Sequence, residues 1–260
     1  MTNVSRGTSA SGLGEDVARQ IDAIVARAQT ANLPPAPTVE PLPIGIIDSY
    51  VPRVLWRWGL SPRERTARED RVPTALRNAL AKVPDEIEEL LTTRRGFGLS
   101  GGAGAGKTFA LVTIFQRAIA TRLRRDATLG FATVERLSEL GRWVPWPDKV
   151  NLMRVTSVEE GGTSIVQGWV VDWINRPVLV IDDLGAERAK GSYSDDWAAS
   201  LLDLVVDARY RALRPTWYTT NLSTQEFHGR YGARLFSRLC GENRLIELPR
   251  MPDLRMGAAR

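Results

Sequence analysis

The residues best suited to chemistry lie in one glycine-rich stretch, residues 98–111. It contains the pattern G-x-x-x-x-G-K-T, which runs from Gly101 to Thr108. Glycines allow successive backbone N–H groups to surround an anion without side chains in the way. A helix that begins near Lys107 would point its positive end at the same anion. The pattern therefore predicts a loop that holds the phosphates of a nucleotide such as ATP.

Each part of this loop has an expected role. Lys107 would reach the β- and γ-phosphate oxygens, and the hydroxyl of Thr108 would ligate Mg²⁺. The backbone that surrounds the phosphates would be that of Gly101, Gly102, Ala103, Gly104, Ala105 and Gly106. The alternative is a flexible Gly/Ala linker that matches by accident. Against it, the loop has the required context, a short strand pattern over 97–100 and an amphipathic helix pattern over 108–125.

A pair of acidic residues follows an apolar run further along the chain. Residues 177–185 predict a buried parallel strand that ends in two carboxylates, those of Asp182 and Asp183. Asp182 would hold the Mg²⁺ shell, and Asp183 would orient the attacking water. Taken alone, two aspartates after a strand are compatible with a simple turn. Downstream of a phosphate loop they predict the second half of an ATP-hydrolysing site.

Further elements follow toward the end of the chain. Residues 196–212 predict a helix, and residues 215–221 predict a strand that ends at Asn221. Asn221 would lie beside the γ-phosphate if this strand neighbours the other two, and an asparagine in an ordinary turn is the alternative. Residues 232–239 predict another helix, and residues 245–248 predict a last strand.

Composition limits the class of protein. The chain has 260 residues, 43% hydrophobic and 25% charged, which is typical of a globular protein with one α/β domain and an appendage. A single cysteine, Cys240, excludes a disulfide framework and a cysteine-based zinc site. The net charge of +5 permits contact with nucleic acid without requiring it. Because the first residues show no apolar signal segment and no run could span a bilayer, we expect a cytoplasmic protein with no membrane partner.

The chain divides into three parts. Residues 1–43 combine a Ser/Gly/Thr-rich start, expected to be disordered, with an amphipathic helix and a proline-rich linker. The tethered helix is suited to docking a partner, and equally to packing on its own chain or self-associating. Residues 44–95 predict a helical, arginine-rich lead-in. Its arginines alternate with acidic residues, which favours a solvated, salt-bridged face over phosphate contacts. Residues 96–260 form the predicted ATPase core.

Periodicity and capping signals place several further elements. The amphipathic helix of the first part covers residues 15–29, and a capping box opens a helix from Ser61 to about residue 70. Another helix is expected over residues 84–95. After the phosphate loop, a strand is expected near residues 129–133 and a helix over residues 134–142.

Residues 143–175 are less regular, and four tryptophans stand out in them: Trp143, Trp146, Trp169 and Trp173. Large aromatic side chains gathered in one segment predict local core. A surface for a partner or for DNA is the less favoured alternative.

The order of these motifs resembles the DnaC/IstB-type branch of the AAA+ ATPases. The resemblance covers about residues 96–255 and depends on six segments in order: SGGAGAGKT, VLVIDDLGAE, VVDARYRALRPT, YTTNLS, GARLFSRL and IELPRMPDLR. It implies an α/β fold of the P-loop NTPase type, with a parallel five-stranded sheet and helices on both faces. It also implies that Asn221 is a sensor-1 residue, Arg238 an arginine finger and Arg255 a sensor-2-like arginine. For Arg238 the alternative is an ordinary arginine on a helix surface.

The resemblance implies an ATP-dependent DNA-processing helper that acts as a homo-oligomer. A replicative-helicase loader, acting on single-stranded DNA and gripping the helicase through the N-terminal region, is favoured by the tethered helix and by Arg255. An IstB-like transposition helper, acting on duplex DNA with a transposase, is the alternative. A nucleotide-dependent module without enzymatic activity is least favoured, because Asp182, Asp183 and the other expected site residues are all present.

Overall fold

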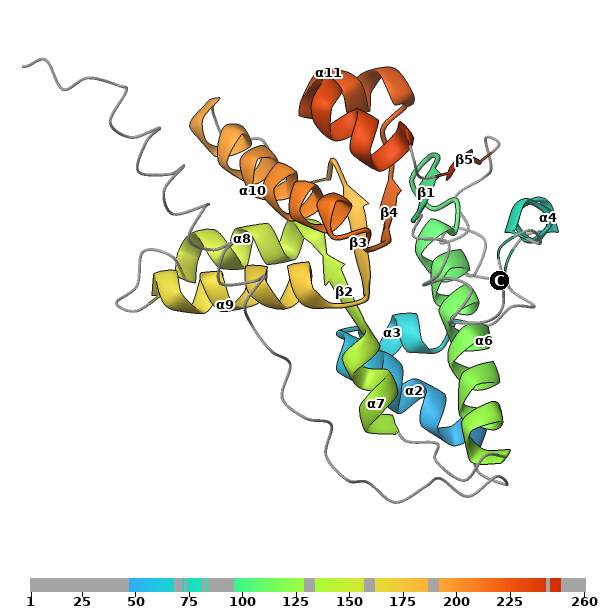
Figure 1. Ribbon diagram of the computed structural model, residues 1–260. Coiled ribbons are helices and arrows are strands. Elements are labelled where there is room, and N and C mark those ends of the chain that lie inside the picture. Colours follow the sequence, from blue (N-terminus) through green and yellow to red (C-terminus); the bar gives the residue numbers. More distant parts are fainter. Residues whose placement is uncertain are drawn as a thin grey trace, which may run out of the picture.

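Figure 1 shows the computed structural model of the chain. The structure describes residues 47–67, 72, 74–80, 83, 96–128, 134–156, 162–186, 192–241 and 244–248.

A five-stranded sheet forms the centre of the described chain. Its strands are β1 (Phe97–Ser100), β2 (Gly141–Pro145), β3 (Val178–Leu184), β4 (Thr216–Thr220) and β5 (Arg244–Glu247). They lie in the order β2-β3-β4-β1-β5, and every neighbouring pair is parallel. The predicted parallel five-stranded sheet is therefore confirmed.

Two sets of helices cover this sheet (Figure 1). One set consists of α2 (Ile47–Trp58), α3 (Pro62–Arg65), α4 (Thr74–Leu80), α6 (Lys107–Thr128) and α7 (Val134–Leu140). The other consists of α8 (Trp146–Thr156), α9 (Gly162–Asn175), α10 (Ser192–Arg211), α11 (Thr224–Phe236) and the short π-helical turn η3 (Ser237–Gly241).

The strands divide the core between these two sets. Successive side chains of a strand point to opposite faces of its sheet. In β3, Val178 and Val180 belong to the hydrophobic cluster shared with α2 and α6, whereas Leu179 and Ile181 belong to the cluster shared with α8 to α11. A strand that is apolar on both faces lies between two helical layers. The expected arrangement, with helices on both faces, is confirmed.

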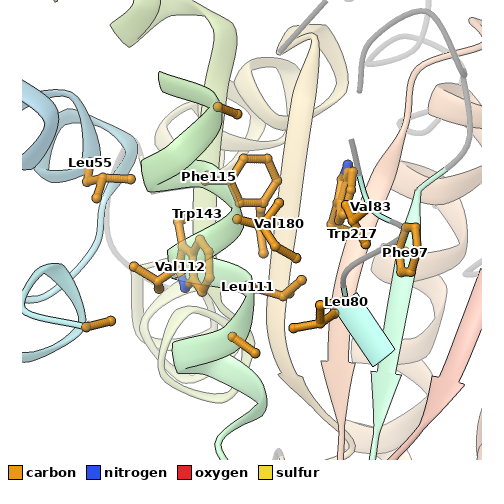
Figure 2. Packing of buried hydrophobic residues seen from close by; sticks show 14 of the residues in the cluster. Leu55, Leu80, Val83, Phe97, Leu111, Val112, Phe115, Trp143, Val180 and Trp217 are labelled. Carbon is orange, nitrogen blue, oxygen red and sulfur yellow. The ribbon is translucent and has the colours of Figure 1, made fainter. Parts of the chain in front are cut away.

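Aromatic side chains join the first helical set to the sheet. Phe115 of α6 packs edge-on against Trp58, Trp143 and Trp217, with ring centroids 5.4, 6.5 and 5.1 Å away. Figure 2 shows Phe115, Trp143 and Trp217 beside Val180 in this cluster. Trp217 also stacks on Phe97 of β1, at 5.3 Å. One cluster of rings therefore ties α2, α6 and three strands together.

Helix α2 is part of the same core. Trp58 is fully buried, and its Nε1 donates to the carbonyl of Leu137 at 3.0 Å. Gly141 lets the ring approach β2 closely, since a Cβ there would stand 2.2 Å from the Trp58 side chain. The helix before the phosphate loop is therefore held on the sheet by packing at a glycine.

A buried arginine fastens the ends of three elements on the other side. Arg209 of α10 is fully buried and donates to Thr216 and to five backbone carbonyls at residues 173, 174, 176, 177 and 215. Burial lowers the pKa of Arg209 to about 9. These bonds fix the start of β3 and of β4 relative to α9, and so help to position β3, the strand that carries Asp182 and Asp183.

Several element boundaries differ from those expected. The capping box between Ser61 and Glu64 is present, but α3 ends at Arg65 because the backbone turns at Thr66. Arg142 lies in β2 rather than in a helix, since β2 begins at Gly141. Helix α11 begins at Thr224, well before the helix expected over residues 232–239, on a second capping box between Ser223 and Glu226.

The tryptophan-rich segment resolves into β2, α8 and α9. Trp143, Trp146 and Trp173 are buried, which confirms local core as the reason for their clustering. Trp169 is partly buried and carries the ammonium of Lys149 over its ring at 3.7 Å. The helices expected over 15–29 and 84–95 and the strand near 129–133 lie outside the described residues. No helix in the described part of the chain has the length and apolar character to cross a membrane.

Candidate nucleotide-binding site

The topology brings three predicted segments to one edge of the sheet. Strands β3, β4 and β1 are neighbours, and their carboxyl ends lie at the same edge because they are parallel. The glycine-rich loop follows β1, Asp182 and Asp183 lie at the end of β3, and Asn221 follows β4. Ligands of open α/β sheets bind outside the carboxyl ends of the strands. This edge is therefore the candidate site.

The backbone of the loop has the conformation that its glycines allow. Gly104 and Gly106 have φ angles of 73° and 85°, in the left-handed region that favours glycine. The N–H of Gly101 donates to the carbonyl of Thr220 at 3.2 Å, which ties the start of the loop to β4. Helix α6 begins at Lys107, so its N-terminus faces the loop as expected. A loop closed on a helix N-terminus fits the binding of phosphate.

Lys107 holds its ammonium over the loop. Its Nζ donates to the carbonyls of Gly101 and Gly102 at 2.8 and 2.9 Å and to Oδ1 of Asn221 at 2.6 Å. The residue is only 7% exposed. The positive charge is therefore fixed between the loop and the end of β4, where phosphate oxygens would compete with these oxygen acceptors.

Asp182 and Thr108 meet at the start of α6. The Thr108 hydroxyl donates to the carboxylate of Asp182, at 3.0 and 3.2 Å from its two oxygens. A third residue, Thr219 of β4, donates to Oδ1 of Asp182 at 2.6 Å and accepts the N–H of Asp183 at 2.8 Å. Thr219 was not among the residues expected at the site. The feature that could have identified it is its position, two residues before Asn221 on a strand that neighbours β3.

The charge environment of Asp182 is unusual for a carboxylate. Burial, above all, raises its pKa to about 6, while hydrogen bonds from Thr219 and Thr108 act in the opposite direction. The negative charges of Glu64 and Asp183 raise the pKa further. Glu64 comes from α3, so the segment before the phosphate loop contributes to the field at the site.

These residues fit a magnesium ion. Mg²⁺ binds through one or two protein oxygens and keeps water and substrate phosphates as its remaining ligands. A buried carboxylate and a threonine hydroxyl in contact supply such oxygens, and two further carboxylates nearby favour a cation. Within the described residues no group of three or more His, Cys, Asp or Glu side chains forms a self-contained metal site. Thr108 and Asp182 would hold the ion together with a bound triphosphate.

Asp183 and Asn221 extend the same network. The Nδ2 of Asn221 donates to Oδ1 of Asp183 at 2.9 Å, so Asn221 bridges Asp183 and Lys107. Asp183 has a φ of 63°, which is uncommon for a residue with a side chain, and the pairing of β3 with β4 shifts register there. Backbone strain of this kind clusters at functional sites. Here it turns the Asp183 side chain toward Asn221.

Arg238 does not join this cluster. It lies in η3 and forms ion pairs with Asp207 and Asp203 of α10, with N···O distances of 2.7 and 3.7 Å. Within one chain, the structure thus unites the loop, Lys107, Thr108, Asp182, Asp183 and Asn221, and leaves Arg238 apart. Arg255 and the side chain of Cys240 lie outside the described residues. His228 is exposed on α11.

Comparison with known proteins gives matches in structure only. A scan against models of protein families finds no match, and neither does a search of curated proteins. A solved DNA replication initiation factor matches with a TM-score of 0.52 and 18% identity, over 77% of this chain and 54% of that chain. The chain has an α/β fold of the P-loop NTPase type. The predicted α/β P-loop fold is confirmed.

Two further solved structures are similar at lower scores. The DnaC helicase loader matches with a TM-score of 0.48 and 19% identity, over 73% of this chain and all 100% of that chain. DnaI matches with a TM-score of 0.43 and 19% identity, over 69% of this chain and 91% of that chain. At these identities the likeness bears on the fold alone. The function of the chain therefore depends on the residues of its site.

Proposed function

We propose that this AAA+ chain hydrolyses ATP and assists DNA replication, loading or remodelling a replicative helicase on single-stranded DNA. One observation carries the ATPase part. The hydrogen-bonded cluster of Lys107, Thr108, Asp182, Asp183 and Asn221 lies at the carboxyl ends of three adjacent strands, directly against a glycine loop. A lysine, a threonine hydroxyl, two carboxylates and an amide next to a glycine loop are the residue types that phosphoryl transfer requires.

The proposed roles follow from charge and position. Phosphoryl transfer is catalysed mainly by positioning and by neutralising charge on the phosphate oxygens. Lys107 would neutralise the β- and γ-phosphates, while Asp183, oriented by Asn221, would position the attacking water. Bound Mg²⁺, held by Thr108 and Asp182, would supply further positive charge at the phosphates. In a homo-oligomer, Arg238 of one subunit would act on the nucleotide of its neighbour.

Motif order and fold support the replication part. The six segments that resemble DnaC/IstB-type proteins occur in sequence order, and the fold that this resemblance implies is the fold observed. The net charge of +5 is compatible with DNA as a partner. Residues 1–43 would carry the contact with the helicase.

Nucleotide binding can be tested by thermal unfolding. A ligand that binds only the folded state stabilises that state and so raises the melting temperature. At a ligand concentration of one hundred times Kd, the stabilisation is about 2.7 kcal/mol. We expect Mg-ATP to raise the Tm of the wild-type chain and to leave the Tm of Lys107→Ala unchanged. A Tm that rises equally in both proteins would contradict the phosphate-loop assignment.

DNA preference separates the loader from the transposition helper. We expect single-stranded DNA to stimulate hydrolysis more than duplex DNA, and the binding affinity to fall steeply as salt rises. Stimulation by duplex DNA alone would favour the transposition helper. Salt-independent binding, or no binding, would contradict a role on DNA. Capture of a replicative helicase by the full chain, lost on deletion of residues 1–43, would identify the N-terminal contact.

A further inference from the structure

The guanidinium of Arg238 is largely covered by its own chain. The side chain is 20% exposed, and its Nη1 atom is buried. Nη2 lies 2.7 Å from Oδ1 of Asp207, and the guanidinium carbon lies 5.7 Å from the centre of the Tyr210 ring. Both partners belong to α10 of the same chain. In this position the guanidinium is held against α10 of its own chain.

Asp207 is the centre of a larger charge cluster. Besides Arg238 it pairs with Arg234 at 3.3 Å and with Arg211, one turn further along α10, at 2.8 Å. Asp203, one turn earlier on the same face of α10, lies 3.8 Å from Arg234 and 3.7 Å from Arg238. Two carboxylates therefore face three guanidinium groups.

A backbone kink brings the arginines to this cluster. Gly232 interrupts α11 with a φ of 80° and a ψ of 164°, so the turn that carries Arg234 and η3 leaves the axis of the first half of the helix. A Cβ at this glycine would meet no other atom, so conformation, not space, is what requires glycine there. The kink gives the Arg238 segment its own direction, toward α10.

We propose that Asp207 acts as a latch, which stores the Arg238 guanidinium on its own chain until the nucleotide of a neighbouring subunit takes its place. The latch would link hydrolysis to assembly, and it rests on the proposed ATPase function. Arg238 has two alternative anionic partners, a carboxylate in the isolated chain and a phosphate in the oligomer. A ligand shifts such an equilibrium by its difference in affinity for the two states.

The ion-pair cluster lowers the free energy needed to release Arg238 from Asp207. Removing one partner of a buried ion pair is costly when the other charge is left uncompensated. Asp207 keeps Arg211 and Arg234 when Arg238 leaves, so its charge remains neutralised. The Arg234 side chain is 60% exposed and its contacts are longer, so it is free to move closer to the carboxylates. This arrangement suits a switch better than a fixed structural pair.

The latch can be tested by measuring ATP hydrolysis against protein concentration for the full chain. Asp207→Asn weakens the stored state, and we expect the concentration for half-maximal rate to fall by about three- to tenfold. The maximal rate per subunit should stay within about twofold. Asp203→Asn, which removes a more distant partner, should shift the midpoint in the same direction by less. Asp172→Asn is a matched control, because Asp172 also holds two arginines, Arg142 and Arg176, on another part of the surface.

A second readout separates the latch from a merely structural effect. Assembly with a non-hydrolysable ATP analogue can be followed by sedimentation, with folding checked by thermal unfolding. Asp207→Asn should strengthen assembly in the wild-type background and leave it unchanged when Arg238→Ala is also present. The latch would be overturned if Asp207→Asn left the protein concentration for half-maximal rate unchanged or raised it. It would also be overturned if Asp207→Asn strengthened assembly equally in the Arg238→Ala background. A wild-type chain that does not bind or hydrolyse ATP would instead overturn the proposed function.

Discussion

Asp182 is a buried carboxylate at the position proposed to bind Mg²⁺. It is 5% exposed, it accepts hydrogen bonds from the hydroxyls of Thr108 and Thr219, and the negative charges of Glu64 and Asp183 act on it. Its pKa of about 6 lies above the usual value of 3.8. Between these two pH values the folded chain binds a proton that the unfolded chain does not. The stability of the ligand-free protein should therefore rise as pH falls from above 6 toward 4.

Replacing this carboxylate by an amide should stabilise the ligand-free chain. Asp182→Asn removes the buried charge and keeps an oxygen that accepts the hydroxyls of Thr108 and Thr219. A pKa difference of about two units corresponds to at most about 3 kcal/mol at pH 7.5. We expect a higher Tm for the variant at pH 7.5, and a difference that disappears near pH 4, both measured with chelator and without nucleotide.

The same variant should lose its response to metal. Without the carboxylate, addition of Mg²⁺ and ATP should produce little hydrolysis, although the protein is more stable than the wild type. A lower Tm at pH 7.5 would contradict the view that Asp182 is retained at a cost to folding. Functional residues that reduce stability in this way are common in active sites.

Among the elements, those around the glycine-rich loop were the most predictable. The run from β1 through the loop to α6 follows from local signals, namely glycine conformation and helical periodicity, and the structure reproduces it. The buried strand before Asp182 follows in the same way. The contribution of Thr219 was not predictable, because it depends on β4 lying next to β3. The pairing of Arg238 with Asp207 was not predictable either, because it depends on the kink at Gly232.

Contact between α2 and the sheet offers a test at the level of elements. Gly141→Ala would place a methyl group against the buried ring of Trp58, where no space exists. Overpacking of this kind costs about 1–3 kcal/mol. We expect urea unfolding to show a loss of stability of this size, because α2 must move away from β2 to accommodate the methyl group.

A glycine with open space around it provides the control. Gly168 lies inside α9, and a Cβ there would meet no other atom. Alanine has a higher helix propensity than glycine by about 1 kcal/mol. Gly168→Ala should therefore leave the stability unchanged or raise it. Equal destabilisation by both changes would show that the Trp58 contact is not the cause.

At the scale of the whole molecule, the described residues of one chain bring together the proposed phosphate and Mg²⁺ ligands but not Arg238. Lys107, Thr108, Asp182, Asp183 and Asn221 meet within the chain, whereas Arg238 faces α10. An arginine finger supplied by a neighbour contributes about 10³–10⁵ in rate. The geometry therefore predicts that hydrolysis belongs to an assembly of chains rather than to a single one.

Mixing two inactive variants tests this division directly. Lys107→Ala should lose nucleotide binding and keep its finger, whereas Arg238→Ala should bind ATP and lose most turnover. In mixed oligomers some sites pair an intact phosphate loop with an intact Arg238, so we expect activity to return to a measurable fraction of the wild-type rate. The double variant Lys107→Ala/Arg238→Ala, mixed with Arg238→Ala, should restore none, because neither chain then offers a finger.

Wild-type turnover by Arg238→Ala alone would remove this arginine from the mechanism. Failure of the first mixture to recover, with both variants folded and assembling, would place the action of Arg238 within its own chain.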